Sequence, residues 1–277
     1  MANSYADLTT LKSGGMLNIT SAALDVRLLA LLEDTSRWID GYCNRHFFVL
    51  NAARRFDGGG GLELPVPDLI GVTTLKTDED QDRIFELLCN DGDYRLYPLN
   101  AQPQQPWGRP YTRVLVDTAA GIRASFPSGQ ATVEIDGQWG YREVLEDSGA
   151  DINQGGGFSA TATVLTVTDG SKFAAGQTVL VESEQMYVSA VSGSDLTVER
   201  GVNGTTAAAH PDGSDISMYR YPGSVVEACL LLASRLWRRR GGDLASGPVE
   251  RVLGLAPDPD VRRLLAPYRR VSVGVGV

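Results

Sequence analysis

The spacing of apolar residues changes twice along this chain, and this change constrains the fold more than any other feature. Between residues 21 and 45, apolar side chains recur every three or four positions, as at Leu24, Leu28 and Leu32, which is the period of one face of an α-helix. From 46 to 219 the period is two and turn residues are frequent, which is typical of β-strands. The helical period then returns. The sequence therefore predicts two long helices with a run of strands between them.

The ends of the predicted helices carry their own signals. Thr20 or Ser21 can cap the first helix, and Ser224-Val-Val-Glu227 has the pattern of a capping box at the start of the second. Gly241-Gly242 marks the end of the second helix, because glycine accepts the left-handed conformation common there. Asp258-Pro259 predicts a third, short helix with Asp as N-cap and Pro in its first turn.

A glycine-rich stretch at 148–158 divides the strand region in two. The strands expected after it have a spacing of about ten residues, which favours a small barrel or sandwich. They are Val164–Thr168, Gln177–Glu182, Met186–Ser192, Asp195–Arg200 and Asp215–Tyr219. The sequence thus predicts an inserted all-β domain at 148–217 and a discontinuous main domain formed by 1–147 and 218–277. The fold class expected is α+β: a bundle of two long helices, with short helices, β-hairpins and extended arms, plus the small barrel or sandwich.

Charge is unevenly distributed along the 277 residues, whose formal net charge is −9. Ten of the 25 basic residues and five of the 34 acidic residues fall in 220–277, so this part carries +5 and the rest −14. An acidic body repels phosphate, which argues against a general nucleic-acid-binding protein. A basic C-terminal part on an acidic body favours contact between unlike protein surfaces.

Metal and phosphate sites find little support in the sequence. Three scattered cysteines and two histidines do not have the spacing of a zinc site. The glycines at 58–61 are not followed by the lysine of a phosphate-binding loop, so they indicate a turn between strands. Asp78-Glu-Asp-Gln-Asp82 begins like a calcium loop, but Arg83 stands where that loop needs glycine and Cys89 where it needs glutamate. No cofactor and no metal is predicted.

Catalytic patterns are equally weak. His46 and His210 lack the setting of a catalytic base, and no Gly-x-Ser-x-Gly is present. Glu182 and Glu184 could serve as an acid–base pair, but we interpret them as the solvated end of a hairpin. The sequence therefore predicts a protein that is not an enzyme, with no catalytic residues.

Five segments, taken in order, carry a resemblance to a known family. They are Leu24–Phe47, which ends in Tyr42-Cys-Asn-Arg45-His-Phe47; the proline-bearing Leu64-Pro-Val-Pro-Asp-Leu-Ile-Gly-Val-Thr-Thr-Leu75; Asp93-Tyr94-Arg-Leu-Tyr97; Val133–Tyr141; and Tyr221-Pro222 followed by Val226–Arg240. In this order and spacing they resemble the head–tail connector, or adaptor, proteins of tailed bacteriophages. The resemblance covers about residues 1–145 and 218–270. The segment 150–217 interrupts it, and is similar to a small β module found in various phage structural proteins.

The resemblance implies an architectural role. Family members form a ring, generally a dodecamer of identical copies, on the portal protein at the capsid vertex. The ring extends the channel through which genomic DNA passes without sequence recognition, and it is the platform for a head-completion (stopper) or tail-terminator protein. A member would be located in the virion neck after assembly in the bacterial cytoplasm, with no membrane partner.

The arginines near the C-terminus are the residues we expect at an interface with the portal or a neighbouring copy. Arg238, Arg239 and Arg240 end the second helix, where cations also interact favourably with the helix dipole, so a purely local role is an equal alternative. The other expected interface residues are Arg262, Arg263, Tyr268, Arg269 and Arg270. A different function is also open at this point: a tail- or fibre-associated module that recognises a host surface through the β insert.

Overall fold

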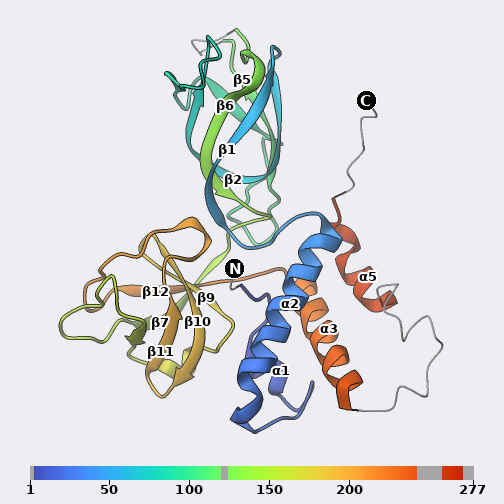
Figure 1. Cartoon of the computed structure of the whole chain (residues 1–277), viewed down its shortest axis with the longest axis vertical. Coiled ribbons are helices and arrows are strands. Elements are labelled where there is room, and N and C mark those ends of the chain that lie inside the picture. The colour runs from blue at the N-terminus through green and yellow to red at the C-terminus, as the bar shows by residue number, and fades with distance from the viewer. Residues whose placement is uncertain (1–2, 120–123, 242–257, 271–277) are drawn as a thin grey trace. The chain divides into compact units, whose positions relative to one another are not determined.

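The computed structural model describes residues 3–119, 124–241 and 258–270 (Figure 1). The chain divides into two compact units. One consists of Met1–His46 with Leu145–Val277, and the other of Phe47–Val144. Among the described residues, no helix has both the length and the hydropathy needed to cross a bilayer.

The expected fold class is wrong. The protein is mainly β, with 35% of residues in strands and 24% in helices, and its 12 strands form two antiparallel sheets. The two long helices of the prediction exist, but they do not form the bundle around which an α+β fold would be organised. The period-two region predicts hairpins and extended arms beside the small β domain, whereas its strands pair into two sheets that each bury a core of their own.

The unit Phe47–Val144 contains a six-stranded sheet. Its strands are β1 (Leu50–Gly59), β2 (Glu63–Thr77), β3 (Leu87–Cys89), β4 (Tyr94–Tyr97), β5 (Tyr111–Val116) and β6 (Ser128–Trp139). The order is β1-β6-β2-β5-β4, with β3 paired to β2. Trp139 is fully buried in this unit, and its indole N–H donates to the carbonyl of Ala52 at 2.7 Å. Bulges in β1 and β2 bend the long strands around this core.

The second sheet belongs to the other unit. Its strands are β7 (Leu145–Asp151), β8 (Val164–Thr166), β9 (Thr178–Val181), β10 (Glu184–Ser192), β11 (Asp195–Glu199) and β12 (Asp215–Tyr219), in the order β7-β12-β9-β10-β11-β8. The two edge strands meet, because Asn153 N–H donates to the Thr166 carbonyl at 2.8 Å and Thr168 N–H to the Asp151 carbonyl at 3.0 Å. The sheet therefore closes into a barrel. Each of the five strands expected after residue 158 overlaps one of these strands.

Three helices of this unit pack together beside the barrel: α2 (Asp25–Cys43), α3 (Gly223–Gly241) and α5 (Pro259–Leu265). Helices α2 and α3 run antiparallel. The middle of α2 meets the first half of α3, where Ser36 Oγ lies 3.5 Å from Cys229 Sγ, and the start of α2 meets the end of α3, where Arg27 stacks over Trp237. Asp258 caps α5 as predicted. Helix α3 begins at Gly223, one residue before the predicted cap Ser224.

An N-terminal segment joins the barrel to these helices. It contains the short helix α1 (Leu8–Lys12), and its residues Asn3, Tyr5, Leu8 and Leu11 are buried. The side chain of Asn3 hydrogen-bonds with Asn203 and accepts from Thr178 at 3.0 Å, both in the barrel. The division into a main domain (1–147 with 218–277) and an insert (148–217) stays a prediction.

Candidate interaction surface

Two of the interface residues expected at the end of α3 have exposed side chains. Arg238 and Arg239 are both exposed in the last turns of the helix. The guanidinium of Arg238 donates to the Met16 carbonyl at 2.5 Å, while no ion pair within the described residues involves Arg239. The side chain of Arg240 lies outside the described part. Cations here interact favourably with the free carbonyls of the helix end, by about 0.3–1 kcal/mol each.

An ion pair fixes the beginning of α5 against α3. Arg235 lies one turn before Arg238, and its guanidinium contacts Asp258 at 2.6 Å and Asp260 at 3.3 Å. Val261 and Leu265 are the buried residues of α5. This arrangement leaves Arg262 and Arg263 exposed, with no ion pair among the described residues.

The remaining expected residues lie at the other end of α5, next to the end of α2. The backbone N–H of Arg270 donates to the Cys43 carbonyl at 2.8 Å, and the exposed Arg269 stacks over the Tyr42 ring at 5.4 Å. Tyr42 itself stacks on Trp38, with ring centroids 5.2 Å apart and planes 7° from parallel. The predicted residues therefore fall in three places: Arg238 and Arg239 at the end of α3, Arg262 and Arg263 on α5, and Tyr268–Arg270 after α5, beside the end of α2.

Trp38 and Tyr42 were missed as members of this surface. The spacing of apolar residues in 21–45 predicts that both lie on the apolar face of the first helix, yet the side chain of Trp38 is 41% exposed. Their spacing of four residues places them side by side on a helix, which is the signal that could have identified a stacked pair. Together with Arg269 they form an aromatic and cationic surface, and such residues are enriched at protein interfaces.

A half-buried carboxylate lies on the opposite face of α2 from Trp38 and Tyr42. Asp40 accepts a hydrogen bond from the Tyr5 hydroxyl and contacts Arg37 at 3.3 Å. Burial raises the pKa of Asp40 to about 6, although Arg37 and the Tyr5 hydroxyl act in the opposite direction. Burial also raises the pKa of the Cys43 thiol to about 11, so this cysteine behaves as a small apolar side chain.

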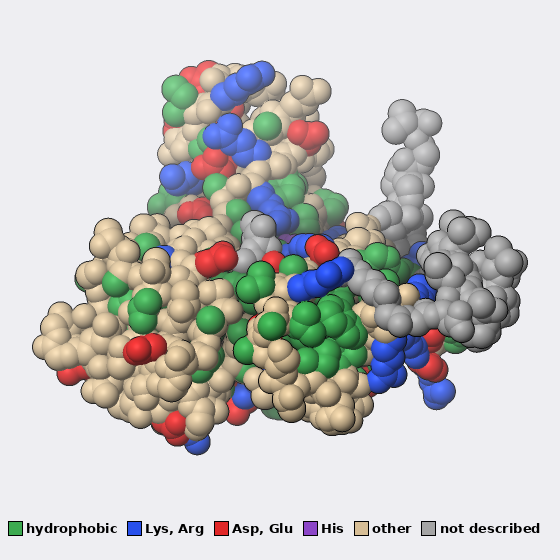
Figure 2. Space-filling view, turned by 60° about the horizontal axis from the view of Figure 1, so that its bottom comes forward, with side chains coloured by type: hydrophobic (Ala, Val, Ile, Leu, Met, Phe, Trp, Pro, Cys, Tyr) green, Lys and Arg blue, Asp and Glu red, His purple; other side chains and the backbone are tan. Residues whose placement is uncertain are grey.

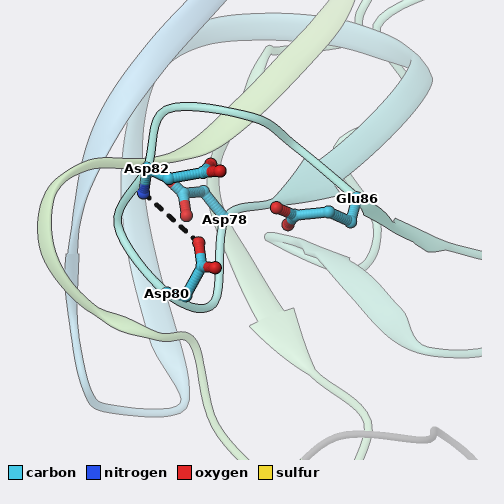
Figure 3. Close-up of side chains that lie close together, drawn as sticks. All are labelled: Asp78, Asp80, Asp82 and Glu86. Atoms are coloured by element: carbon cyan, nitrogen blue, oxygen red, sulfur yellow. Dashed lines mark hydrogen bonds between the residues drawn. The ribbon is translucent and has the colours of Figure 1, made fainter.

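The acidic loop after β2 gathers four carboxylates, as Figure 3 shows. The oxygens that could bind a cation lie within 4.8 Å of one another and come from Asp78, Asp80, Asp82 and Glu86. Asp78 is buried, and its two oxygens accept the backbone N–H groups of Gln81 at 2.7 Å and Arg83 at 2.8 Å. Arg83 has a φ of 72° where a calcium loop has glycine. These backbone hydrogen bonds explain the loop, and we assign no metal to it.

A buried carboxylate corrects the prediction that Glu182 and Glu184 form the solvated end of a hairpin. Glu184 is not solvated: its side chain is fully buried in the barrel wall. Both of its oxygens accept from the Arg200 guanidinium at 2.7 Å, and they also accept the N–H groups of Gly201 at 3.0 Å and Ala208 at 2.9 Å. His210 Nε2 lies 2.8 Å from Glu184 and its Nδ1 2.9 Å from Glu182.

The guanidinium of Arg200 has hydrogen-bond or aromatic partners on every side. Besides Glu184, its guanidinium donates to the carbonyls of Ser159, Ala162 and Ala208 at 2.6–2.8 Å, and it lies 4.1 Å from the centre of the Phe158 ring. Burial alone would raise the pKa of Glu184, but the hydrogen bonds from Arg200, Ala208, His210 and Gly201 lower it to about 2. The cluster ties the 200–210 loop to the barrel, which is a structural role.

Comparisons with known proteins give only distant similarity. No family model and no curated protein sequence matches the chain. A chain from the neck of an empty GTA particle, computed with C6 symmetry, is 16% identical with a TM-score of 0.44, over 98% of this chain and 93% of that one. A chain from the neck of a native GTA particle, computed with C12 symmetry, is 16% identical with a TM-score of 0.39, over 100% and 98% of the two chains. The function of this chain is therefore argued from its own residues.

Proposed function

We infer that this chain is a structural protein of the neck of a tailed-phage-like particle, a head–tail adaptor. Copies of it form a ring on the portal protein, extend the DNA channel, and provide the platform for a head-completion or tail-terminator protein. The proposal begins from the order of the five sequence segments that resemble the adaptor family. It assigns the protein an assembly role and no catalytic step.

The observation that carries the proposal is the exposed cationic surface on the helices. Two of the five segments, Leu24–Phe47 and Tyr221-Pro222 followed by Val226–Arg240, fall on α2 and α3, which pack against each other. Arg239, Arg262, Arg263 and Arg269 are exposed on this helical part of a chain with a net charge of −9. Exposed cations held on rigid helices are suited to meeting an acidic surface of another protein, because complementary charge speeds association and fixes orientation.

The charge of the rest of the chain agrees with a channel role. DNA must slide through an adaptor ring, and a strongly basic lining would hold the phosphates. Residues 1–219 carry a net charge of −14, so the body of the protein offers little to hold DNA. The adaptor proposal therefore requires binding to protein and not to nucleic acid.

The test is binding to the cognate portal protein. Wild-type chain mixed with the portal is expected to give a stoichiometric ring, visible by electron microscopy. The double variant Arg262→Glu/Arg263→Glu should weaken portal binding by about tenfold or more, because it places two negative charges opposite the acidic surface proposed for the portal. Arg109→Glu is the matched control, because it makes the same change at an exposed arginine of the other unit. Portal binding by the double variant equal to that of the control would contradict the assigned surface.

A further inference from the structure

An open apolar groove lies between the barrel and the N-terminal part of the helical region. Its volume is about 930 Å³, near the upper end of the ~300–1,000 Å³ typical of binding pockets. The apolar side chains that line it are Leu8, Ile19, Val26, Leu29, Phe173, Ala174, Ala175, Ala190 and Val191. Figure 2 shows that hydrophobic side chains gather on the forward face of the molecule. The groove belongs to the unit Met1–His46 with Leu145–Val277, and it is not part of the cationic surface described above.

The side of the groove that α2 lines exposes a large apolar side chain to solvent. Val26, in the first turn of α2, is 86% exposed, the highest value for a large apolar side chain among the described residues. The charged groups in the lining, Lys12 and Asp25, pair with each other, and Ser189 donates to the Thr197 carbonyl at 3.0 Å. An occupant of this groove would therefore be recognised by its apolar side chains.

The chain itself carries a segment with the matching chemistry. Residues 271–277 read Val-Ser-Val-Gly-Val-Gly-Val and lie outside the described residues. Valine stands at every second position, with only serine or glycine between. In an extended conformation, alternate side chains point to the same face, so this segment can present four valines to an apolar groove while its other face stays small.

The length of the segment decides which copy can supply it. Arg270 is fixed to the end of α2 by its hydrogen bond to Cys43, while the groove lies at the beginning of α2, at Val26 and Leu29. At about 1.5 Å per helical residue, Leu29 is about 21 Å and Val26 about 26 Å from Cys43. An extended chain spans at most about 3.6 Å per residue, so Val275 reaches about 18 Å and Val277 about 25 Å. In its own copy, only the last valine could touch the part of the groove that α2 lines.

We propose that this groove receives residues 271–277 of a neighbouring copy of the same chain. The donor segment leaves from one end of α2 and the acceptor groove lies at the other end, so the contact is head-to-tail. Such heterologous contacts generate rings when the rotation between copies closes. The proposal rests on the proposed adaptor function, since it supplies the contact that links one subunit of the ring to the next.

The first experiment measures the contact without a ring. A fluorescent peptide with the sequence of residues 269–277 is titrated into the intact chain. We expect saturable binding that Val26→Asp weakens by about tenfold or more, and that a peptide with all four valines changed to serine does not show. Leu99→Asp, at a residue 60% exposed in the other unit, is the matched control and should bind like the wild type. Equal affinity of Val26→Asp and Leu99→Asp for the peptide would overturn the proposal.

A second experiment identifies the occupant in the assembled state. A photo-crosslinking p-benzoylphenylalanine at position 26 is placed in ¹⁵N-labelled chain, which is mixed with unlabelled wild type and the portal. Trypsin cuts after Arg270, so the expected product is a labelled peptide joined to unlabelled 271–277. Capture of residues 242–257, of the copy's own 271–277, or of another surface would each overturn the proposal.

Ring formation by the wild-type chain and the variants distinguishes a failure of the groove proposal from a failure of the adaptor proposal. If wild-type chain and portal give no ring, the adaptor proposal fails, whereas peptide binding still decides whether the groove accepts the segment. If wild type gives rings and both Val26→Asp and deletion of 271–277 give them equally well, the adaptor proposal stands and the groove proposal fails.

Discussion

The two six-stranded sheets of this protein are stabilised in different ways. In the sheet of Phe47–Val144, two charged pairs lie at the surface: Arg55–Glu134 at 3.0 Å and Arg95–Asp117 at 2.8 Å each have an arginine that is 57% exposed. In the barrel, Glu184 and Arg200 form an ion pair in which the two side chains are 0% and 7% exposed. The first sheet is packed around Trp139, and the barrel has an ionic cluster built into its wall.

This difference shows where polar residues matter for stability. An exposed pair gains little, because water and salt screen it. A buried pair has lost its hydration, so removing one partner leaves a charge with no compensation. Substitutions of similar chemistry should therefore have unequal effects in the two sheets, and hydrogen exchange measured peptide by peptide can follow each sheet separately.

The largest expected effect is at Arg200. Changing Arg200→Met keeps much of the volume but leaves Glu184 buried without its cation, which should lower the free energy of unfolding of the barrel by about 3–5 kcal/mol. The measurement is hydrogen exchange in peptides from β9, β10 and β11, with peptides from β2 and β6 as the internal reference. A loss below about 1 kcal/mol would mean that the two sheets do not differ as described.

The same carboxylate should make the barrel sensitive to acid. Its pKa is lowered from the usual 4.5 to about 2 in the folded protein, so the unfolded chain binds the proton more readily. The stabilisation is complete above pH 4.5 and is lost as the pH falls toward 2, by about 3 kcal/mol in all. Denaturant unfolding of wild type and Glu184→Gln between pH 2 and pH 6 measures this. The variant should lack this pH dependence, and parallel curves for the two proteins would contradict the assignment.

A smaller effect is expected where the N-terminal segment meets the barrel. Asn3→Ala removes hydrogen-bond partners of the buried Asn203 and Thr178, which should destabilise this contact by about 1–3 kcal/mol. Faster exchange should appear in residues 3–12 and in β9, both of which lie at the contact. Exchange that rises in residues 3–12 alone would show that the barrel does not depend on this segment.

The smallest effect should come from the exposed pairs. A double-mutant cycle of Arg55→Ala and Glu134→Ala is expected to give a coupling free energy of about 0.2–1 kcal/mol, decreasing as salt is added. The measurement is unfolding in denaturant at low and high salt, followed by hydrogen exchange in peptides from β1 and β6. A coupling as large as the Arg200 effect would remove the distinction between the two sheets.

The sequence predicted local elements better than their assembly. Helix α2, helix α3 and the Asp258 cap follow from spacing and end signals, and the strands after residue 158 follow from alternation and turns. The α+β class was wrong because short alternating runs such as 94–97 do not reveal which strands they pair with. Pairing depends on partners far away in the chain, and no local pattern records them.

The candidate sites show the same limit. The exposure of Arg262 and Arg263 agrees with their place on a short amphipathic helix, whereas Glu184 was misjudged because its partners Arg200, Ala208 and His210 come 16–26 residues later. The Trp38–Tyr42 stack had a readable spacing, but an aromatic pair on an apolar helix face has the same pattern when it is buried. The groove at Val26 exists only where the barrel and the helices meet, so no single segment predicts it.

The hydrogen bond between Asn3 and Asn203 can form only after both residues have been synthesised, which delays the folding of the N-terminal segment. The two residues are 200 positions apart. At about 5–20 residues per second, a ribosome needs roughly 10–40 s to synthesise the partner after Asn3 has been made. During that time the N-terminal segment, with the apolar side chains of Tyr5, Leu8 and Leu11, is without the barrel that covers it. A cell that makes this protein must therefore keep that segment from other apolar surfaces until residue 203 has left the ribosome.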